Sequence, residues 1–152
     1  MRRAGFGSGN GRCRALHVAT APHLQESFRV IEAWGFQYVT NIAWVKDKIG
    51  LGFWVRNQHE LLLIATRGNI PCPLTENRPT SVIKADRREH SRKPDEAYEL
   101  IERMYPDLPK IELFARSTRK GWAVWGNQAP PLVPDDGLDN PEFLKRSKAG
   151  VA

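Results

Sequence analysis

Apolar residues recur along the chain with two spacings, and the wider spacing predicts helices. Leu24, Phe28 and Ile31 recur at i, i+4 and i+7, which places them on one helical face. Pro22 suits the first turn of such a helix, and Gly35 is a typical stop signal after it. The pattern therefore predicts a helix that begins near Pro22 and ends before Gly35.

A second helix is predicted to begin at Pro94. Asp95 and Glu96 would lie in its first turn, where the helix dipole favours acidic side chains. Its inner face is predicted to consist of apolar side chains at helical spacing, namely Ala97, Leu100, Ile101 and Met104.

Shorter apolar runs predict strands. The run at residues 61–65 is continuous, as in strands buried on both faces, and it lies in a predicted strand at 59–66. The segment at 38–45 is predicted as a strand because it is rich in β-branched and aromatic residues, and further strands are predicted at 16–20, 81–85, 110–116 and 121–125. The order strand, helix, strand, strand, strand, helix, strand, strand predicts an α/β fold, with a mixed sheet flanked by helices.

Composition changes towards both ends of the chain. Residues 1–14 are rich in Gly and Arg, and residues 129–152 are rich in Pro and Asp. We therefore expect a disordered N-terminal segment at 1–14, one domain at 15–128 and a flexible C-terminal tail at 129–152.

The charge balance permits a polyanionic partner without demonstrating one. Lys and Arg number 23 against 17 Asp and Glu, a net charge of +6. The two cysteines, Cys13 and Cys72, lack metal-ligand spacing, so we expect free thiols and no metal site. No apolar run has the length of a membrane span or a signal peptide, so the expected location is the cytoplasm, away from membranes.

Three stretches of the sequence are distinctive enough, taken together, to indicate a protein family. The first is Trp44-Val45-Lys46 with residues 52–62, the second is residues 90–96, and the third is residues 110–116 with residues 121–128. In this order, from Leu16 to Gln128, they resemble the N6-adenine methyltransferases of the Asp-Pro-Pro-Trp type. That family includes the messenger-RNA N6-adenosine methyltransferases and their bacterial and phage DNA-modifying relatives. The resemblance implies a Rossmann-like class I methyltransferase fold and methyl transfer from S-adenosylmethionine to adenine.

The third stretch has the chemistry that this cofactor requires. Glu112, Phe114 and Arg116 alternate along a predicted strand, so they would point to the same face, and Arg116 would lie at the strand's carboxyl end. Ligands of open α/β sheets bind beyond such ends. The alternative is a buried strand with Phe114 in the core and Arg116 in solvent.

The resemblance implies that Lys93, Phe114, Arg116, Asn127 and Gln128 hold S-adenosylmethionine. Asn127 and Gln128 would bind the ribose hydroxyls, and Lys93 would reach the carboxylate or line the mouth of the site. Glu112 belongs to the same cofactor strand.

Basic residues surround the second stretch and predict contact with nucleic acid. Arg87, Arg88 and Arg92 are candidates for phosphate contacts, in one cluster with Lys84 and Lys93. Arg56 is a further candidate from another part of the chain. An ordinary solvated basic face is the alternative. Residues 50–59 match a family loop that lies near the substrate or a partner subunit, and Trp54 is either an exposed contact or, the preferred interpretation, part of the core.

The catalytic Asp-Pro-Pro-Trp motif of the family is absent from the chain, so we assign it no catalytic residue. Asn140-Pro141-Glu142-Phe143 departs from the motif at its third residue, and the glycine-rich run at 6–9 follows no strand. In the family the motif precedes the segment matching residues 16–20. We therefore expect an N-terminally truncated fold that exposes a sheet edge, is marginally stable, and is completed by an upstream fragment or a second subunit.

Two functions follow from these observations. The first is an N6-adenine methyltransferase acting on nucleic acid, with DNA favoured over RNA because the chain is compact. The alternative is a non-catalytic nucleic-acid-binding or scaffold subunit of a methyltransferase complex.

Overall fold

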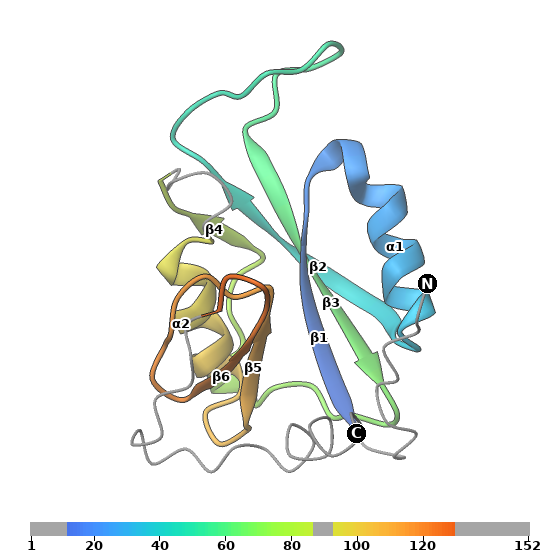
Figure 1. Ribbon diagram of the computed structural model, residues 1–152, viewed down its shortest axis with the longest axis vertical. Helices are drawn as coiled ribbons and strands as arrows, with labels where there is room; N and C mark the ends of the chain where they lie inside the picture. The colour runs from blue at the N-terminus through green and yellow to red at the C-terminus, as the bar shows by residue number, and fades with distance from the viewer. Residues whose placement is uncertain (1–11, 87–92, 130–152) are drawn as a thin grey trace. The chain divides into compact units, whose positions relative to one another are not determined.

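The computed structural model describes residues 12–86 and 93–129 (Figure 1). The helices and strands follow one another in the predicted order, and the α/β class is confirmed. The chain forms two compact units, Met1–Pro106 and Asp107–Ala152, and each is described by itself.

The first unit contains a mixed four-stranded sheet. Its strands are β1 (Cys13–Ala19), β2 (Gln37–Val45), β3 (His59–Arg67) and β4 (Val82–Lys84), in the spatial order β1-β3-β2-β4. β3 is antiparallel to both β1 and β2, and β2 is parallel to β4. Consequently β1, β2 and β4 run in one direction, and their carboxyl ends lie at the same edge as the beginning of β3.

β3 is buried on both faces, as its continuous apolar run predicted. Leu62 and Ile64 belong to one core cluster, whereas Leu63 and Ala65 belong to another. Because successive side chains of a strand point to opposite faces, the two clusters lie on the two faces of the sheet.

One helix covers each face (Figure 1). Helix α1 (Leu24–Ala33) follows the short 3-10 helix η1 (Ala21–His23) and packs Ile31 into the cluster of Leu63. Helix α2 (Asp95–Met104) packs Ala97 and Met104 into the cluster of Leu62. Gly35 follows α1 with a φ of 76°, which glycine adopts without steric cost and which confirms it as the stop signal.

The second unit contains a pair of parallel strands, β5 (Lys110–Leu113) and β6 (Trp122–Trp125). Lys110 pairs with Trp122, and Leu113 pairs with Trp125, so the two strands end together. Trp122, Val124 and Ala115 are buried.

Three details differ from the prediction. The strands form two sheets instead of one, because β5 and β6 pair only with each other among the described residues. β1 begins at Cys13, so Cys13 and Arg14 belong to the fold and not to the N-terminal segment. β5 ends at Leu113, three residues before the predicted end at Arg116. Across the described ranges, no helix combines the length and apolar content that crossing a bilayer requires.

Candidate ligand site at the strand ends

A hollow lies beyond the carboxyl ends of β5 and β6. Its volume is about 230 Å³, and it is lined by Phe114, Ala115, Asn127 and Gln128. The first two residues follow β5 directly, and the other two follow β6 after Gly126. Parallel strands present their carboxyl ends at one edge, where open α/β sheets bind their ligands.

The backbone at Phe114 shapes one wall of the hollow. Phe114 has a φ of 60°, a left-handed conformation that is uncommon for residues other than glycine. The next residue, Ala115, donates its backbone N–H to the carbonyl of Trp125 at 3.1 Å. The Phe114 ring is 66% exposed and packs edge-to-face on Trp125, with the ring centroids 5.9 Å apart. An apolar ring is therefore held at the mouth of the hollow.

Gly126 allows the end of β6 to approach the Phe114 backbone closely. A Cβ atom at Gly126 would lie 2.8 Å from the Cα of Phe114 and 3.1 Å from the backbone nitrogen of Ala115. Its φ of 155° is also one that residues with side chains rarely adopt. A side chain at this position would push the two strand ends apart, so the hollow depends on this glycine.

The structure brings together three of the residues predicted to bind the cofactor. Phe114, Asn127 and Gln128 line one hollow. Arg116 is exposed two residues after Phe114, and Glu112 is half-buried within β5. The prediction that Glu112, Phe114 and Arg116 share one face of a strand is wrong, because the left-handed Phe114 ends the alternation of an extended chain. Lys93, the remaining candidate, belongs to the other unit and lies just before α2.

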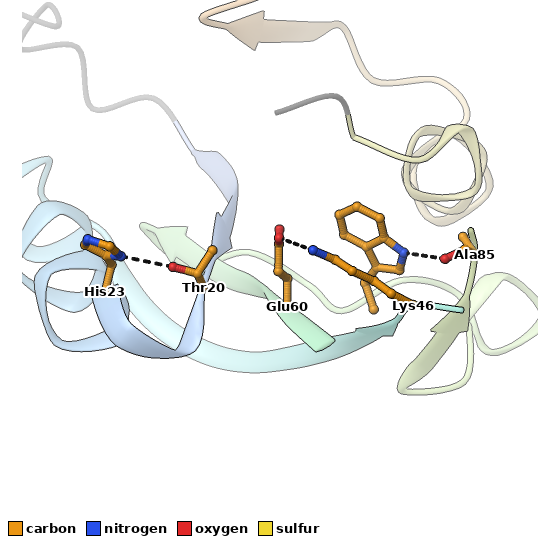
Figure 2. A network of polar contacts seen from close by, with 6 residues as sticks. Thr20, His23, Lys46, Glu60 and Ala85 are labelled. Carbon is orange, nitrogen blue, oxygen red and sulfur yellow. Dashed lines mark hydrogen bonds and ion pairs between the residues drawn. The ribbon is translucent and has the colours of Figure 1, made fainter. Parts of the chain in front are cut away.

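The first unit has its own group of polar residues at the carboxyl-end edge of its sheet (Figure 2). Thr20 follows β1, Lys46 follows β2, Ala85 follows β4, and Glu60 lies at the beginning of β3. This edge therefore offers a hydroxyl, an ammonium, a carboxylate and a backbone carbonyl from four neighbouring strands.

Lys46 and Glu60 form an ion pair at the centre of this edge, with only 18% and 19% of their side chains exposed. The Lys46 ammonium also lies 4.7 Å from the centre of the Trp44 ring. Trp44 in turn donates its indole N–H to the carbonyl of Ala85 at 3.0 Å (Figure 2). This pair was not predicted from the sequence, although Lys46 and Glu60 flank the loop between two predicted strands, which is a signal for cross-strand contact.

Two histidines join β1 to the start of α1. The Thr20 hydroxyl lies 3.1 Å from Nδ1 of His23, and Nε2 of His17 lies 3.2 Å from the Ser27 hydroxyl. Burial lowers the pKa of His17 below its ordinary value, and the positive charge of Lys93 lowers it further.

Only one of the predicted phosphate contacts lies in the described part of the chain. Arg56 is exposed in the loop between β2 and β3 and donates from Nε to the carbonyl of Gly50 at 3.4 Å. Arg87, Arg88 and Arg92 lie outside the described residues. The preferred interpretation of Trp54 as core is wrong, since its side chain is 100% exposed in the same loop.

Comparison with known proteins identifies the family of the chain. The sequence model of the MT-A70 family matches residues 15–128. The fold is a Rossmann-like methyltransferase fold, and the chain belongs to the MT-A70 family.

Individual relatives come from bacteria and eukaryotes. The chain is 36% identical over 131 residues to the Type II methyltransferase M.MunI of Mycoplasma sp, covering 85% of this chain and 54% of that protein. It is 40% identical over 120 residues to a probable N(6)-adenosine-methyltransferase MT-A70-like protein of Oryza sativa subsp. japonica, covering 71% of this chain and 17% of that protein. It is 36% identical over 130 residues to the N(6)-adenosine-methyltransferase catalytic subunit METTL3 of Homo sapiens, covering 78% of this chain and 21% of that protein. The chain therefore spans about half the length of M.MunI and a smaller share of the other two.

Proposed function

We propose that this chain is the cofactor-binding part of an S-adenosylmethionine-dependent N6-adenine methyltransferase that acts on nucleic acid. The observation that carries the proposal is the hollow beyond β5 and β6, lined by Phe114, Asn127 and Gln128. The names of the relatives, which include N(6)-adenosine-methyltransferases, support the reaction class. DNA is the proposed substrate, and the cytoplasm is the proposed location.

The side chains around the hollow fit the adenosine half of the cofactor. The amides of Asn127 and Gln128 each offer donors and acceptors to the two ribose hydroxyls, and the exposed ring of Phe114 offers a flat face to adenine. A hollow of about 230 Å³ is smaller than the about 300–1,000 Å³ typical of sites for whole drug-sized ligands. We therefore assign the methionine carboxylate to Arg116, which is exposed in the same unit two residues after Phe114.

When bound, the cofactor supplies a methyl group on a positively charged sulfur, and the acceptor is the exocyclic amine of adenine. That amine is a weak nucleophile because its lone pair is delocalised into the ring, so it needs an acceptor for its hydrogens. Asp-Pro-Pro-Trp, which has this role in the family, is not in the sequence. The proposal therefore includes a completing segment, from a longer protein or a second subunit, that carries the motif.

The polar edge of the first unit is the proposed position for the nucleic acid. Thr20, Lys46 and Glu60 offer both donors and acceptors there. The exposed Lys84 is the last residue of β4 and lies at the same edge of the sheet. A charged edge of this kind suits a ligand that presents both base edges and phosphates.

Binding of S-adenosylhomocysteine tests the proposal. We expect this product to raise the thermal midpoint of the full chain when a family segment carrying Asp-Pro-Pro-Trp is present. A ligand at a hundredfold excess over its Kd stabilises a protein by about 2.7 kcal/mol. Asn127→Ala should abolish the shift without lowering the midpoint of the free chain, because Asn127 is exposed.

Gln25→Ala is the matched control, since it removes an exposed amide from α1, remote in sequence from the hollow. It should leave the shift unchanged. Absence of a shift in the wild-type chain with the completing segment would contradict the proposal. Nucleic-acid affinity without any such shift would favour the scaffold alternative.

A further inference from the structure

Arginines gather at the edge of the first sheet that lies opposite the carboxyl-end edge, where β1 begins and β3 ends (Figure 1). Arg12 directly precedes β1, Arg14 is its second residue, and Arg67 is the last residue of β3. Arg78 follows in the segment between β3 and β4. We call these four residues the arginine edge. Cys13 pairs with Arg67 across the two strands, so the first three arginines come from adjoining backbone.

Two guanidinium groups tie the segment after β3 to this edge. Arg14 donates from Nη2 to the carbonyl of Pro71 at 3.1 Å. Arg78 donates from Nε to the carbonyl of Pro73 at 3.0 Å, and from Nη2 to the sulfur of Cys72 at 3.2 Å. The two guanidinium groups therefore hold the carbonyls on either side of Cys72, whose side chain is exposed.

Aromatic rings fix two of the arginines. The guanidinium carbon of Arg14 lies 4.2 Å from the centre of the Tyr105 ring, and that of Arg67 lies 5.1 Å from the centre of the Phe36 ring. Burial raises the pKa of the Tyr105 hydroxyl, and the positive charge of Arg14 beside it lowers that pKa in part, with Cys72 also acting on it. Arg14, Tyr105 and Cys72 are therefore close neighbours. Stacking fixes the plane of a guanidinium group, while its N–H donors lie in that plane and stay directed outwards.

The charge of the arginine edge is not balanced by carboxylates. Within residues 12–86 and 93–129, none of its four arginines forms an ion pair with Asp or Glu. The buried Nε atoms of Arg14 and Arg67 also have no acceptor among these residues. Like charges held close together repel, and buried donors without acceptors cost free energy, so an anion bound at this edge would stabilise the chain.

The composition of this edge favours the phosphates of nucleic acid over an acidic protein. Its cations are all arginines, whose planar donors match phosphate oxygens two at a time, whereas the opposite edge has Lys46 and Lys84. Interfaces with nucleic acid are much more positively charged than interfaces between proteins, whose cores are depleted in charge.

The spacing between the two edges fits the repeat of a nucleic-acid strand. β1 runs from one edge to the other, and a strand rises about 3.3 Å per residue, so Arg14 and Thr20 are roughly 20 Å apart. Phosphates of one strand of duplex DNA follow one another about every 3.4 Å along the axis, so this distance corresponds to about six nucleotides.

We propose that the arginine edge binds phosphates of the nucleic acid about six nucleotides away from the target adenine. This inference rests on the proposed function, because it assumes that the nucleic acid meets the opposite edge at Lys46 and Glu60. Phosphate contacts at a distance from the reacting base position a substrate without reading its sequence.

The salt dependence of binding counts the phosphates that this edge contacts. Affinity of the full chain for a fluorescein-labelled DNA duplex, long enough to span both edges, is measured by anisotropy over a range of salt concentrations. Each phosphate contact contributes about one to the slope of log affinity against log salt. The double variant Arg14→Gln/Arg78→Gln should therefore reduce this slope by about two.

Arg29→Gln is the matched control, since it removes the same charge from an exposed position on α1, which covers the other face of the sheet from Tyr105. It should leave the slope unchanged. Arg78→Lys keeps the charge but not the planar pair of donors, so it should weaken binding while retaining the slope. An unchanged slope in the double variant would overturn the inference.

Alkylation of Cys72 tests the same contact with the arginines intact. Cys13 and Cys72 are the two cysteines of the chain, so Cys13→Ser leaves one thiol, which is exposed between the carbonyls that the guanidinium groups bind. Added duplex should slow its reaction with N-ethylmaleimide, followed by intact mass spectrometry, at the concentration that saturates the anisotropy. An unchanged rate at saturating duplex would contradict the proposal.

Two further anions identify the source of the bound charge. Inorganic phosphate that protects Cys72 as well as the duplex does, at equal phosphate concentration, would show a site for free phosphate and overturn the assignment to nucleic acid. Equal protection by poly-glutamate would assign the edge to an acidic protein and overturn it too. Strong protection by the duplex with weak protection by both other anions is the expected result.

The cofactor shift is measured on the same chain. A chain that responds to S-adenosylhomocysteine, but whose Cys72 is not protected by the duplex, would disprove the arginine edge alone. A chain whose Cys72 is protected, but which shows no response to S-adenosylhomocysteine with the completing segment present, would disprove the proposed function and leave the phosphate contact standing.

Discussion

The carboxyl-end edges of the two units are built in different ways. In the first unit, side chains tie neighbouring strands together, through the Lys46–Glu60 ion pair and the bond from Trp44 to Ala85. In the second unit, the backbone shapes the hollow, through the left-handed Phe114 and its close approach to Gly126. The first edge therefore depends on charge and hydrogen bonding, whereas the second depends on conformation and on the absence of a side chain.

The largest expected effect lies in the core that supports the first edge. Leu63 is fully buried at 0% exposure on β3, so Leu63→Ala should lower the free energy of unfolding by about 2–5 kcal/mol. Urea unfolding followed by circular dichroism measures this loss. Hydrogen exchange then shows whether β5 and β6 lose protection together with β3 or retain it. A loss as small as that of exposed Leu74→Ala would show that β3 is not the core strand described above.

Adding a methyl group at Gly126, after the end of β6, should disrupt the close approach that shapes the second edge. Gly126→Ala should cost about 1–3 kcal/mol through strain and contact with Phe114, and should remove the thermal response to S-adenosylhomocysteine. Gly121→Ala is the matched variant, because Gly121 has a φ of 82° but nothing within 4 Å of an added Cβ. It should cost stability by strain alone and keep the response. A retained response in Gly126→Ala would show that the hollow is not the ligand site.

Removing the charge of Glu60 tests the first edge, with a smaller expected loss of stability than the two changes above. Glu60→Gln keeps an acceptor for the Lys46 ammonium but removes the ion pair, which should cost about 1 kcal/mol and less in high salt. Chemical denaturation at low and high salt measures both quantities. Glu99→Gln on the exposed side of α2 is the control and should show neither effect. A cost that does not change with salt would contradict an electrostatic origin.

The smallest effect concerns pH. Because the folded-state pKa of His17 is lowered by burial, the unfolded state takes up its proton more readily than the folded state. The contribution of His17 to stability is therefore complete above its ordinary pKa of 6.5 and is lost as the pH falls through and below that value. Unfolding measured between about pH 7.5 and pH 5 should show this decline. His17→Gln should make the curve flatter, and an unchanged curve would contradict the assignment.

The sequence predicted the elements better than their assembly. Apolar spacing located both helices and all strands within a few residues, because burial of Ile31 or Leu63 leaves a periodic pattern. It did not show that the strands divide into two sheets, since pairing depends on contacts far apart in the sequence. The resemblance that pointed to the family was confirmed by the match at residues 15–128.

The candidate site was predicted by residue type but not by geometry. Asn127, Gln128 and Phe114 meet in one hollow, yet alternation along a strand was the wrong reason for placing Phe114 there. A left-handed backbone conformation can be anticipated from the sequence where the residue is glycine, but not where it is phenylalanine. The exposure of Trp54 could likewise not be predicted, because a tryptophan in an apolar run is more often buried. Its exposure depends on the tight turn at Gly50 and Gly52.

The bond from Trp44 to Ala85 has a consequence for the order of folding. It joins residues separated by 41 positions, and it adjoins the parallel pairing of β2 with β4, a kind of contact that forms slowly. The antiparallel pair of β2 and β3 closes a much shorter loop of chain, between Val45 and His59. We therefore expect the bond between Trp44 and Ala85 to form late in folding, so that Trp44→Phe accelerates unfolding while leaving the refolding rate nearly unchanged in a chevron experiment.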